Sequence, residues 1–202
     1  MPPETTQLTA LLERARAGDR KARDDVLEAV YGQLRGLGRR YLRGERRGHT
    51  LETTALVHEA YVRLLQGGEL PGRNRAQLLS FIAKAMRHIL VDHARARASL
   101  KRGGDRARVD LDERLVVEPA GDERLAALDD ALRRLEELDE RKGRVVELRY
   151  FGNLSIEEIA EALEVSPATV KRDWQVARTW LYHEITRDGP EGKSSGPAAG
   201  QE

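Results

Sequence analysis

The sequence has no cysteine, few aromatic residues and no long hydrophobic run. Aromatic side chains make up only 4% of its 202 residues. Without thiols the chain can form neither disulfide bonds nor thiolate metal sites. No apolar run approaches the roughly 20 residues that span a bilayer, and residues 1–7 lack the basic and apolar regions of a signal peptide. We therefore expect a protein of a reduced cytoplasm that does not insert into a membrane.

Strand-like runs of alternating Val, Ile and Thr are also scarce, whereas charged residues make up 34% of the chain. This composition predicts an all-α fold with two small helical domains joined by a flexible linker. The predicted divisions are a first domain at residues 1–104, a linker at 105–121, a four-helix second domain at 122–187 and a disordered tail at 188–202. The tail is rich in Gly, Pro, Ser and Ala and cannot bury a core.

The formal net charge of +1 hides a strong polarity along the chain. Residues 1–104 carry 20 Lys and Arg against 11 Asp and Glu, a net charge of +9, and residues 105–202 carry 15 against 23, a net charge of −8. The first half is therefore the expected place for extensive phosphate contact. Within the acidic half, residues 165–187 are an exception, with 4 basic and 2 acidic side chains.

Capping residues and apolar spacing predict the helices. Gly18 and Asp19 separate a helix at about residues 6–17 from one that runs towards Tyr41. Further helices are expected at about 53–66, 75–99 and 140–150. Asp122 is expected to cap a helix whose inward face carries Leu125, Leu128, Leu132 and Leu135.

The segment SIEEIAEALEVSPATVKRDWQVARTWL, residues 155–181, predicts two short helices joined by a tight turn. Ser155 followed by Glu158 forms a capping box, and Ser166 followed by Pro167 marks a second helix start. Such a unit is typical of a helix-turn-helix DNA reader. Val170, Trp174, Ala177 and Leu181 are expected to face inward. The side chains expected to point towards DNA are Pro167, Ala168, Thr169, Lys171, Arg172, Gln175 and Arg178. The alternative is an ordinary amphipathic hairpin with a solvated basic face.

Two helices of the first half carry further candidate surfaces. In LETTALVHEAYVRLLQ, residues 51–66, apolar groups cover more than one helix face, which indicates either a partner-binding face or a helix buried between two neighbours. The helix at 75–99 combines an apolar face with a basic row that could follow a nucleic-acid backbone or simply solubilise the surface.

An enzyme is not expected. His58 and Glu59 resemble the start of a zinc-protease motif, but the position that needs a second His is Val62. His88 and His93 are five residues apart and do not share a helix face well. No glycine-rich phosphate loop or nucleophile signature is present. We therefore predict no catalytic residue, no metal site and no cofactor.

Three segments together carry a family resemblance. TALVHEAYVRLLQ, AQLLSFIAKAMRHILVDHARARASLKRGG and the unit at 155–181 occur in the order and spacing of a bacterial RNA polymerase sigma factor of the extracytoplasmic-function (ECF) type. The chain resembles that family over nearly all of residues 7–187. The match is closest to a subset with M-R-x-I-L-V-D-H-A-R in the first domain and R-D-W in the reading helix.

The resemblance implies a two-domain initiation factor that binds core RNA polymerase and directs it to promoter DNA. By this resemblance, the clamp coiled coil of the largest polymerase subunit would contact Leu56, Val57, Glu59, Val62 and Leu65. The downstream promoter element and its unwound strand would contact Arg73, Asn74, Arg75, Lys84, Arg87, His88, Asp92 and Arg95. The helix that begins at Pro167 would read the upstream element in the major groove. Whether an anti-sigma factor masks the two domains is left open.

Asp173 and Phe81 depart from the usual pattern of the family. Asp173 stands where many relatives carry a basic or small residue, and it could accept a hydrogen bond from cytosine or pair with a neighbouring Arg. Phe81 is the single aromatic residue of the helix at 75–99, so strand opening would depend on other residues. The rival interpretation is a helix-turn-helix repressor or activator that acts without being a polymerase subunit.

Overall fold

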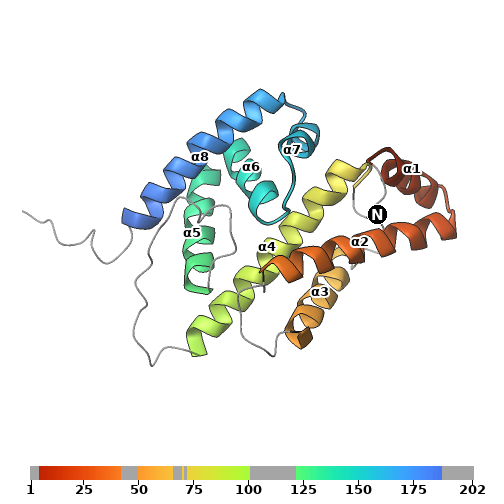
Figure 1. Cartoon of the computed structure of the whole chain (residues 1–202), viewed down its shortest axis with the longest axis horizontal. Coiled ribbons are helices and arrows are strands. Elements are labelled where there is room, and N and C mark those ends of the chain that lie inside the picture. The colour runs from red at the N-terminus through yellow and green to blue at the C-terminus, as the bar shows by residue number, and fades with distance from the viewer. Residues whose placement is uncertain (1–4, 42–49, 66–69, 71, 101–121, 188–202) are drawn as a thin grey trace, which may run out of the picture.

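A computed structural model describes residues 5–41, 50–65, 70, 72–100 and 122–187. These residues contain eight helices and no strand, which confirms the predicted all-α fold. The helices are α1 (Thr5–Arg16), α2 (Arg20–Tyr41), α3 (Thr50–Leu65), α4 (Arg75–Leu100), α5 (Asp122–Leu138), α6 (Glu140–Tyr150), α7 (Ile156–Leu163) and α8 (Pro167–Arg187) (Figure 1). The predicted linker at 105–121 and the predicted tail at 188–202 lie outside the described residues.

Side-chain caps fix several helix starts at the predicted places. Oδ1 of Asp19 accepts a hydrogen bond of 3.1 Å from the backbone N–H of Ala22 at the start of α2. Asn74 caps α4 in the same way, and Asp139 caps α6. Because these acceptors satisfy amides that have no partner within the helix, each helix begins at a defined residue.

Helices α1 to α4 form the N-terminal group, and α5 to α8 form the C-terminal group. In the N-terminal group α2 packs between α1 and α3, and α3 packs on α4. In the C-terminal group α8 packs on α5, α6 and α7. Gly143 allows α6 to approach α5 closely, since a Cβ at this position would overlap Cγ of Glu136. The four leucines predicted to face inward from α5 are all buried, namely Leu125, Leu128, Leu132 and Leu135.

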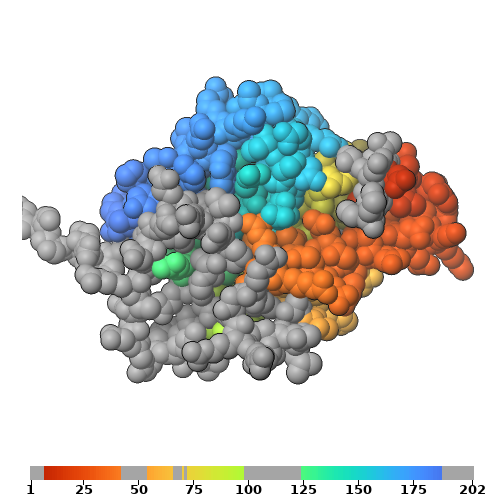
Figure 2. Space-filling view, viewed as in Figure 1, coloured from red at the N-terminus to blue at the C-terminus, as the bar shows by residue number. Residues whose placement is uncertain are grey.

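The long helix α4 joins the two groups. It packs against α3 on one side and against α5, α6 and α7 on the other (Figure 1). The buried apolar residues form one continuous cluster that runs from Leu8 in α1 to Leu181 in α8. Figure 2 shows the cyan part of the C-terminal group beside the orange helix α2, and the hydroxyl of Tyr41 in α2 donates to the carbonyl oxygen of Tyr150 in α6. The division into two domains around residues 105–121 stays a prediction, because the connecting residues are outside the described part.

None of the described helices is long and apolar enough to cross a membrane.

Candidate nucleic-acid interface

Helices α7 and α8 form the predicted helix-turn-helix unit, and its turn is held by side chains. The backbone N–H of Glu158 donates to Oγ of Ser155 at 3.1 Å, and Oε2 of Glu158 accepts from the backbone N–H of Ser155 at 2.7 Å. This reciprocal pair is the predicted capping box. Glu164 ends α7 in the left-handed conformation, with φ of 55°. Oγ of Ser166 then accepts from the backbone N–H of Thr169 at 3.1 Å and starts α8.

The two faces of α8 differ as predicted, with one adjustment. Val170, Ala177 and Leu181 are fully buried. Trp174 is only partly buried, and the guanidinium carbon of Arg149 lies 5.6 Å from its ring centroid. On the outer side Pro167, Ala168, Lys171, Arg172 and Gln175 are exposed, and Thr169 and Arg178 are partly exposed. The outer face of α8 is therefore accessible along its first three turns.

Asp173 does not belong to that outer face. Its side chain is 2% exposed, and both carboxylate oxygens lie near the guanidinium of Arg141 in α6, with the shorter N–H···O hydrogen bond at 2.7 Å. Hydrogen bonding to Asp173 raises the pKa of Arg141 above its ordinary value. Of the two alternatives for Asp173, the structure has the pair with a neighbouring Arg.

Helix α3 buries part of the face that the family resemblance assigns to polymerase. Leu56 and Val57 are 4% and 1% exposed and belong to the core. The prediction that these two side chains lie on an accessible surface is wrong, because α3 packs against both α2 and α4. Val62 is 43% exposed, Glu59 is exposed and ion-paired with Arg63 at 2.9 Å, and Leu65 is partly exposed. The accessible part of the predicted docking face is therefore Glu59, Val62 and Leu65.

The residues predicted to contact the downstream element fall into two sets. Arg73, Lys84, His88 and Asp92 are exposed, and Asn74 is the α4 cap. Nδ1 of His88 lies 2.8 Å from the carbonyl oxygen of Lys84 within α4. The second set is Arg75, Arg87 and Arg95, and all three pair with acids of the C-terminal group.

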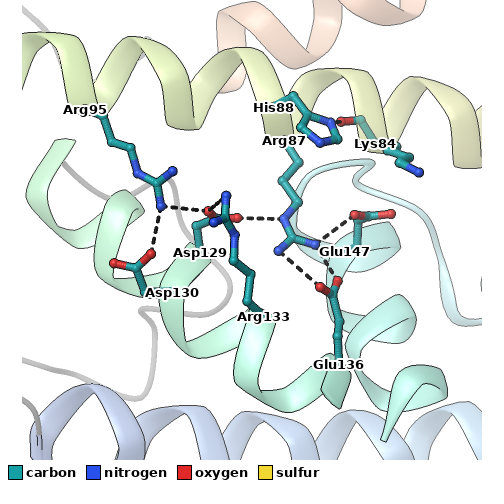
Figure 3. Close-up of polar contacts among 9 residues, drawn as sticks. All are labelled: Lys84, Arg87, His88, Arg95, Asp129, Asp130, Arg133, Glu136 and Glu147. Carbon is teal, nitrogen blue, oxygen red and sulfur yellow. Dashed lines mark hydrogen bonds and ion pairs between the residues drawn. The ribbon is translucent and has the colours of Figure 1, made fainter. Parts of the chain in front are cut away.

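Arg87 is the most deeply buried of these arginines, with 7% of its surface exposed. Its Nε donates to Oδ1 of Asp129 at 2.8 Å, and its Nη1 donates to Oε2 of Glu147 at 3.0 Å and also to Glu136 (Figure 3). Burial alone would lower the pKa of Arg87, but the hydrogen bonds and charge of Glu136, with those from Asp129 and Glu147, raise it above its ordinary value. We call Arg87, Asp129, Glu136 and Glu147 the Arg87 cluster.

Two more ion pairs flank the Arg87 cluster. Nη2 of Arg95 lies 2.7 Å from Oδ1 of Asp130 and 3.1 Å from Oδ2 of Asp129 (Figure 3). Asp129 also accepts Arg133 of its own helix at 3.1 Å. Near the start of α4, Arg75 pairs with Glu158 of the capping box. Acids of α5, α6 and α7 therefore engage α4 from its first residue to Arg95.

A cleft of about 890 Å³ opens beside the Arg87 cluster, between α4 and the C-terminal group. Phe81 lines it and is 48% exposed. Lys84 and His88 line it from the α4 side, and Arg144 lines it from α6. Of the exposed members of the predicted downstream set, Lys84, His88 and Asp92 thus face the space between the groups, whereas Arg73 does not line this cleft.

The sequence profile of the ECF sigma factor family matches residues 5–187. The chain belongs to the ECF sigma factor family. Membership implies a transcription initiation factor that works with RNA polymerase and binds promoter DNA, rather than an enzyme. No curated protein matches the chain.

The residues that sequence reasoning missed are the acidic partners of α4. Asp129 and Glu136 are seven residues apart on α5 and therefore lie on one side of that helix, next to the buried leucines. Two features of the sequence could have indicated these partners. Asp129 and Glu136 stand at the edge of the apolar stripe of α5, and the half of the chain that contains them has a net charge of −8, against +9 for the other half. These features indicate attraction between the halves but do not identify the pairs.

Proposed function

We propose that this ECF sigma factor directs core RNA polymerase to specific promoters through three surfaces. The outer face of α8 reads the upstream element in the major groove. Helix α4 and the residues before it contact the downstream element and its unwound strand. The accessible part of α3, around Val62, docks on the polymerase clamp. In this proposal residues 1–104 and 122–187 act as separate domains.

The observation that carries the proposal is the exposed outer face of α8 within a capped helix-turn-helix unit. In such units the second helix lies in the major groove and its first residues contact base edges. Lys171, Arg172 and Gln175 are exposed there and can donate to bases or phosphates. Because Asp173 is turned away and paired with Arg141, the accessible charges of this turn are the two cations.

Support for the downstream surface comes from the basic character of α4 and its neighbourhood. Arg73, Lys84 and His88 are exposed, so they can contact the sugar-phosphate backbone without any rearrangement. Arg75, Arg87 and Arg95 need to exchange their carboxylate partners first. Phe81 offers an accessible aromatic ring on which an unpaired base could stack.

Run-off transcription with purified core polymerase and genomic DNA fragments tests the proposal directly. We expect transcripts from a small set of fragments only when the sigma factor is present, and co-elution of the chain with core polymerase. The variant Lys171→Ala with Arg172→Ala should lose those transcripts and still co-elute. Lys21→Ala with Arg35→Ala removes the same charge from exposed positions of α2 and serves as the matched control.

Two results would overturn the proposal. One is a chain that binds DNA but never co-elutes with core polymerase, which is the behaviour of a simple repressor or activator. The other is loss of co-elution in the Lys171 and Arg172 variant, since α8 would then be a polymerase surface rather than a DNA reader.

A further inference from the structure

Helix α2 has one long face that is open to a partner. The helix packs against α1, α3 and α4, and its buried residues run from Ala22 to Gly38. The exposed side carries a stripe of residues with the three- and four-residue spacing of one helix face, namely Asp25, Glu28, Gly32, Arg35, Gly36 and Arg39. Figure 2 shows the orange helix α2 at the molecular surface. Arg40 and Tyr41, which contact the C-terminal group, lie on a different side of the helix. We call this stripe the α2 face.

The charges of the α2 face are divided about Gly32. Asp25 and Glu28 precede Gly32 by seven and four residues, and Arg35 and Arg39 follow it by three and seven. None of these four side chains forms an ion pair within the described part of the chain. The α2 face therefore has an acidic end and a basic end of equal length, and neither is neutralised by the protein itself.

This pattern is complementary to itself in one arrangement. If two copies of α2 cross antiparallel on a two-fold axis at Gly32, Asp25 of each copy lies opposite Arg39 of the other, about 10 Å from the axis. Glu28 then lies opposite the turn that carries Arg35. Because such an interface is isologous, each contact occurs twice. A parallel arrangement would instead bring like charges together.

The glycines of the α2 face allow a second helix to come close. A Cβ at Gly32 or Gly36 would meet no atom within 4 Å, so the packing of the chain itself does not require glycine at either position. Glycine is also a poor helix former. The distance between packed helices depends on the side chains at the contact, so a glycine at the crossing point permits close approach. Gly36 leaves room for the methylene groups of Glu28 from the other copy.

We propose that two copies of the chain associate through the α2 face, antiparallel, with Gly32 of each copy at the crossing point. The partner is a second copy because the charge pattern matches its own reverse. The paired part of α2, residues 25–39, is about 21 Å long. One helix pair of that length is at the low end of specific interfaces, so the dimer is weak. None of the three surfaces of the proposed function lies on α2, so this inference goes beyond that function and does not depend on it.

Charge exchange between two variants of the full chain tests the pairing. Asp25→Lys with Glu28→Lys makes the α2 face entirely basic, and Arg35→Glu with Arg39→Glu makes it entirely acidic. Sedimentation velocity at increasing concentration should show a monomer–dimer equilibrium for the wild type. Each variant alone should have a dimer Kd at least about a hundredfold higher, because like charges oppose one another. An equimolar mixture should form heterodimers, because every contact is again between opposite charges.

A second pair of variants controls for net charge. Glu137→Lys with Glu161→Lys, and Arg16→Glu with Arg144→Glu, make the same charge changes at exposed positions outside α2. Each control should dimerise like the wild type, and their mixture should associate no more strongly than the wild type does. Equal association in the two mixtures would mean that net charge alone drives it, and the proposal would be wrong. A wild type that stays monomeric at every concentration overturns it as well.

Disulfide trapping tests the antiparallel geometry. Since the sequence has no cysteine, Gly32→Cys gives each copy a single thiol, and the two thiols of a dimer meet at the two-fold axis. Gly36→Cys is the matched control, because the two copies of position 36 lie about 12 Å apart along the helices, which is beyond the reach of a disulfide. Both positions have free space for a side chain. After mild oxidation, non-reducing electrophoresis should show a linked dimer for Gly32→Cys only. Equal linking at both positions would exclude this arrangement.

Co-elution with core polymerase distinguishes a second copy from the polymerase as the partner of the α2 face. If the wild type is monomeric and Asp25→Lys with Glu28→Lys abolishes co-elution, the α2 face belongs to the polymerase and the proposal is wrong. If the dimer and the trapping pattern are as expected but the chain never supports transcription, the proposed function fails and the self-association stands.

Discussion

Nε of Arg141 donates a hydrogen bond of 2.7 Å to Oδ2 of Asp173 and thereby joins α6 to α8. Asp173 is an acid in the middle of a helix that we propose reads DNA, yet it is 2% exposed and turned towards the protein. Its place in the sequence, directly after two exposed cations, therefore says nothing about base recognition. The ion pair therefore fixes the position of α8 against α6.

Replacing Asp173 by Asn tests this assignment. Since a buried acceptor loses its charge-assisted bond, we expect a lower melting temperature and an unchanged order of promoter preference. Thermal unfolding and run-off transcription on promoters with single base changes measure the two effects. Gln175→Ala is the matched control, because Gln175 is exposed on α8 and should change base preference without changing stability. An altered preference with Asp173→Asn would restore the base-reading alternative.

The fold should be less stable at acid pH, in part because Glu158 becomes protonated. Burial raises the pKa of this carboxyl, but hydrogen bonds from the Ser155 backbone and from Arg75 outweigh it and leave the pKa below its ordinary value of 4.5. A lowered pKa in the folded state means that the contribution is fully present above pH 4.5 and is lost as the pH falls through the folded-state value. Urea unfolding at about pH 7, 5 and 3, on both sides of the ordinary pKa of about 4.5, measures this loss of stability.

Glu158→Gln isolates that contribution. Gln keeps an oxygen that can accept the Ser155 N–H, so the capping box survives while the charge towards Arg75 is removed. We expect this variant to lose less stability between neutral and acid pH than wild type. The variant should still lose some stability in acid, because hydrogen bonds from Lys142 also lower the pKa of Asp139 in the folded state. An equal acid response in variant and wild type would show that Glu158 does not contribute.

The helices could be predicted from the sequence because each capping or spacing pattern involves only residues that are close together in the chain. The capping box at Ser155, the cap at Ser166 and the leucine spacing of α5 all act within one or two turns, and all are present. The partners of Arg87 lie 42, 49 and 60 residues away along the chain. Periodicity shows which face of a helix is inward, but it does not show which inward charges meet.

Because periodicity does not identify the packing partners of a helix, it also led to the wrong prediction that Leu56 and Val57 of α3 are accessible. Leu56, Val57 and Val62 are equally apolar in the sequence, and a wide apolar face is expected both for a docking helix and for one packed on two neighbours. The structure divides them, because α2 and α4 cover Leu56 and Val57 and leave Val62 accessible. Only the packing partners could separate the two explanations.

This division makes a paired prediction for polymerase binding. Val62→Asp places a charge on the accessible part of α3, so we expect loss of co-elution with core polymerase at an unchanged melting temperature. Leu56→Asp buries the same charge in the core, so the melting temperature should fall sharply. Size-exclusion chromatography and thermal unfolding distinguish the two. Normal co-elution of Val62→Asp would remove this face from the polymerase interface.

Phe151 and Trp174 should differ in their contribution to stability. Phe151 is fully buried, 4.9 Å from the ring centroid of Tyr150 in edge-to-face contact and stacked on Tyr41 at 6.4 Å, so its loss leaves a cavity where the two groups meet. Phe151→Ala should reduce the free energy of unfolding by about 3 to 5 kcal/mol. Trp174 is only partly buried, so Trp174→Ala should cost less than about 3 kcal/mol.

Urea unfolding of both variants at about pH 7, where the carboxylates are ionised, measures the difference in their free energies of unfolding. Because Phe151 also lies beside Arg87, its removal should loosen the contact between α4 and the C-terminal group before the helices themselves unfold. Amide hydrogen exchange in α4 should therefore become faster for Phe151→Ala than for Trp174→Ala at equal distance from the unfolding midpoint. Equal exchange rates would place Phe151 in the C-terminal core alone, without a part in holding α4.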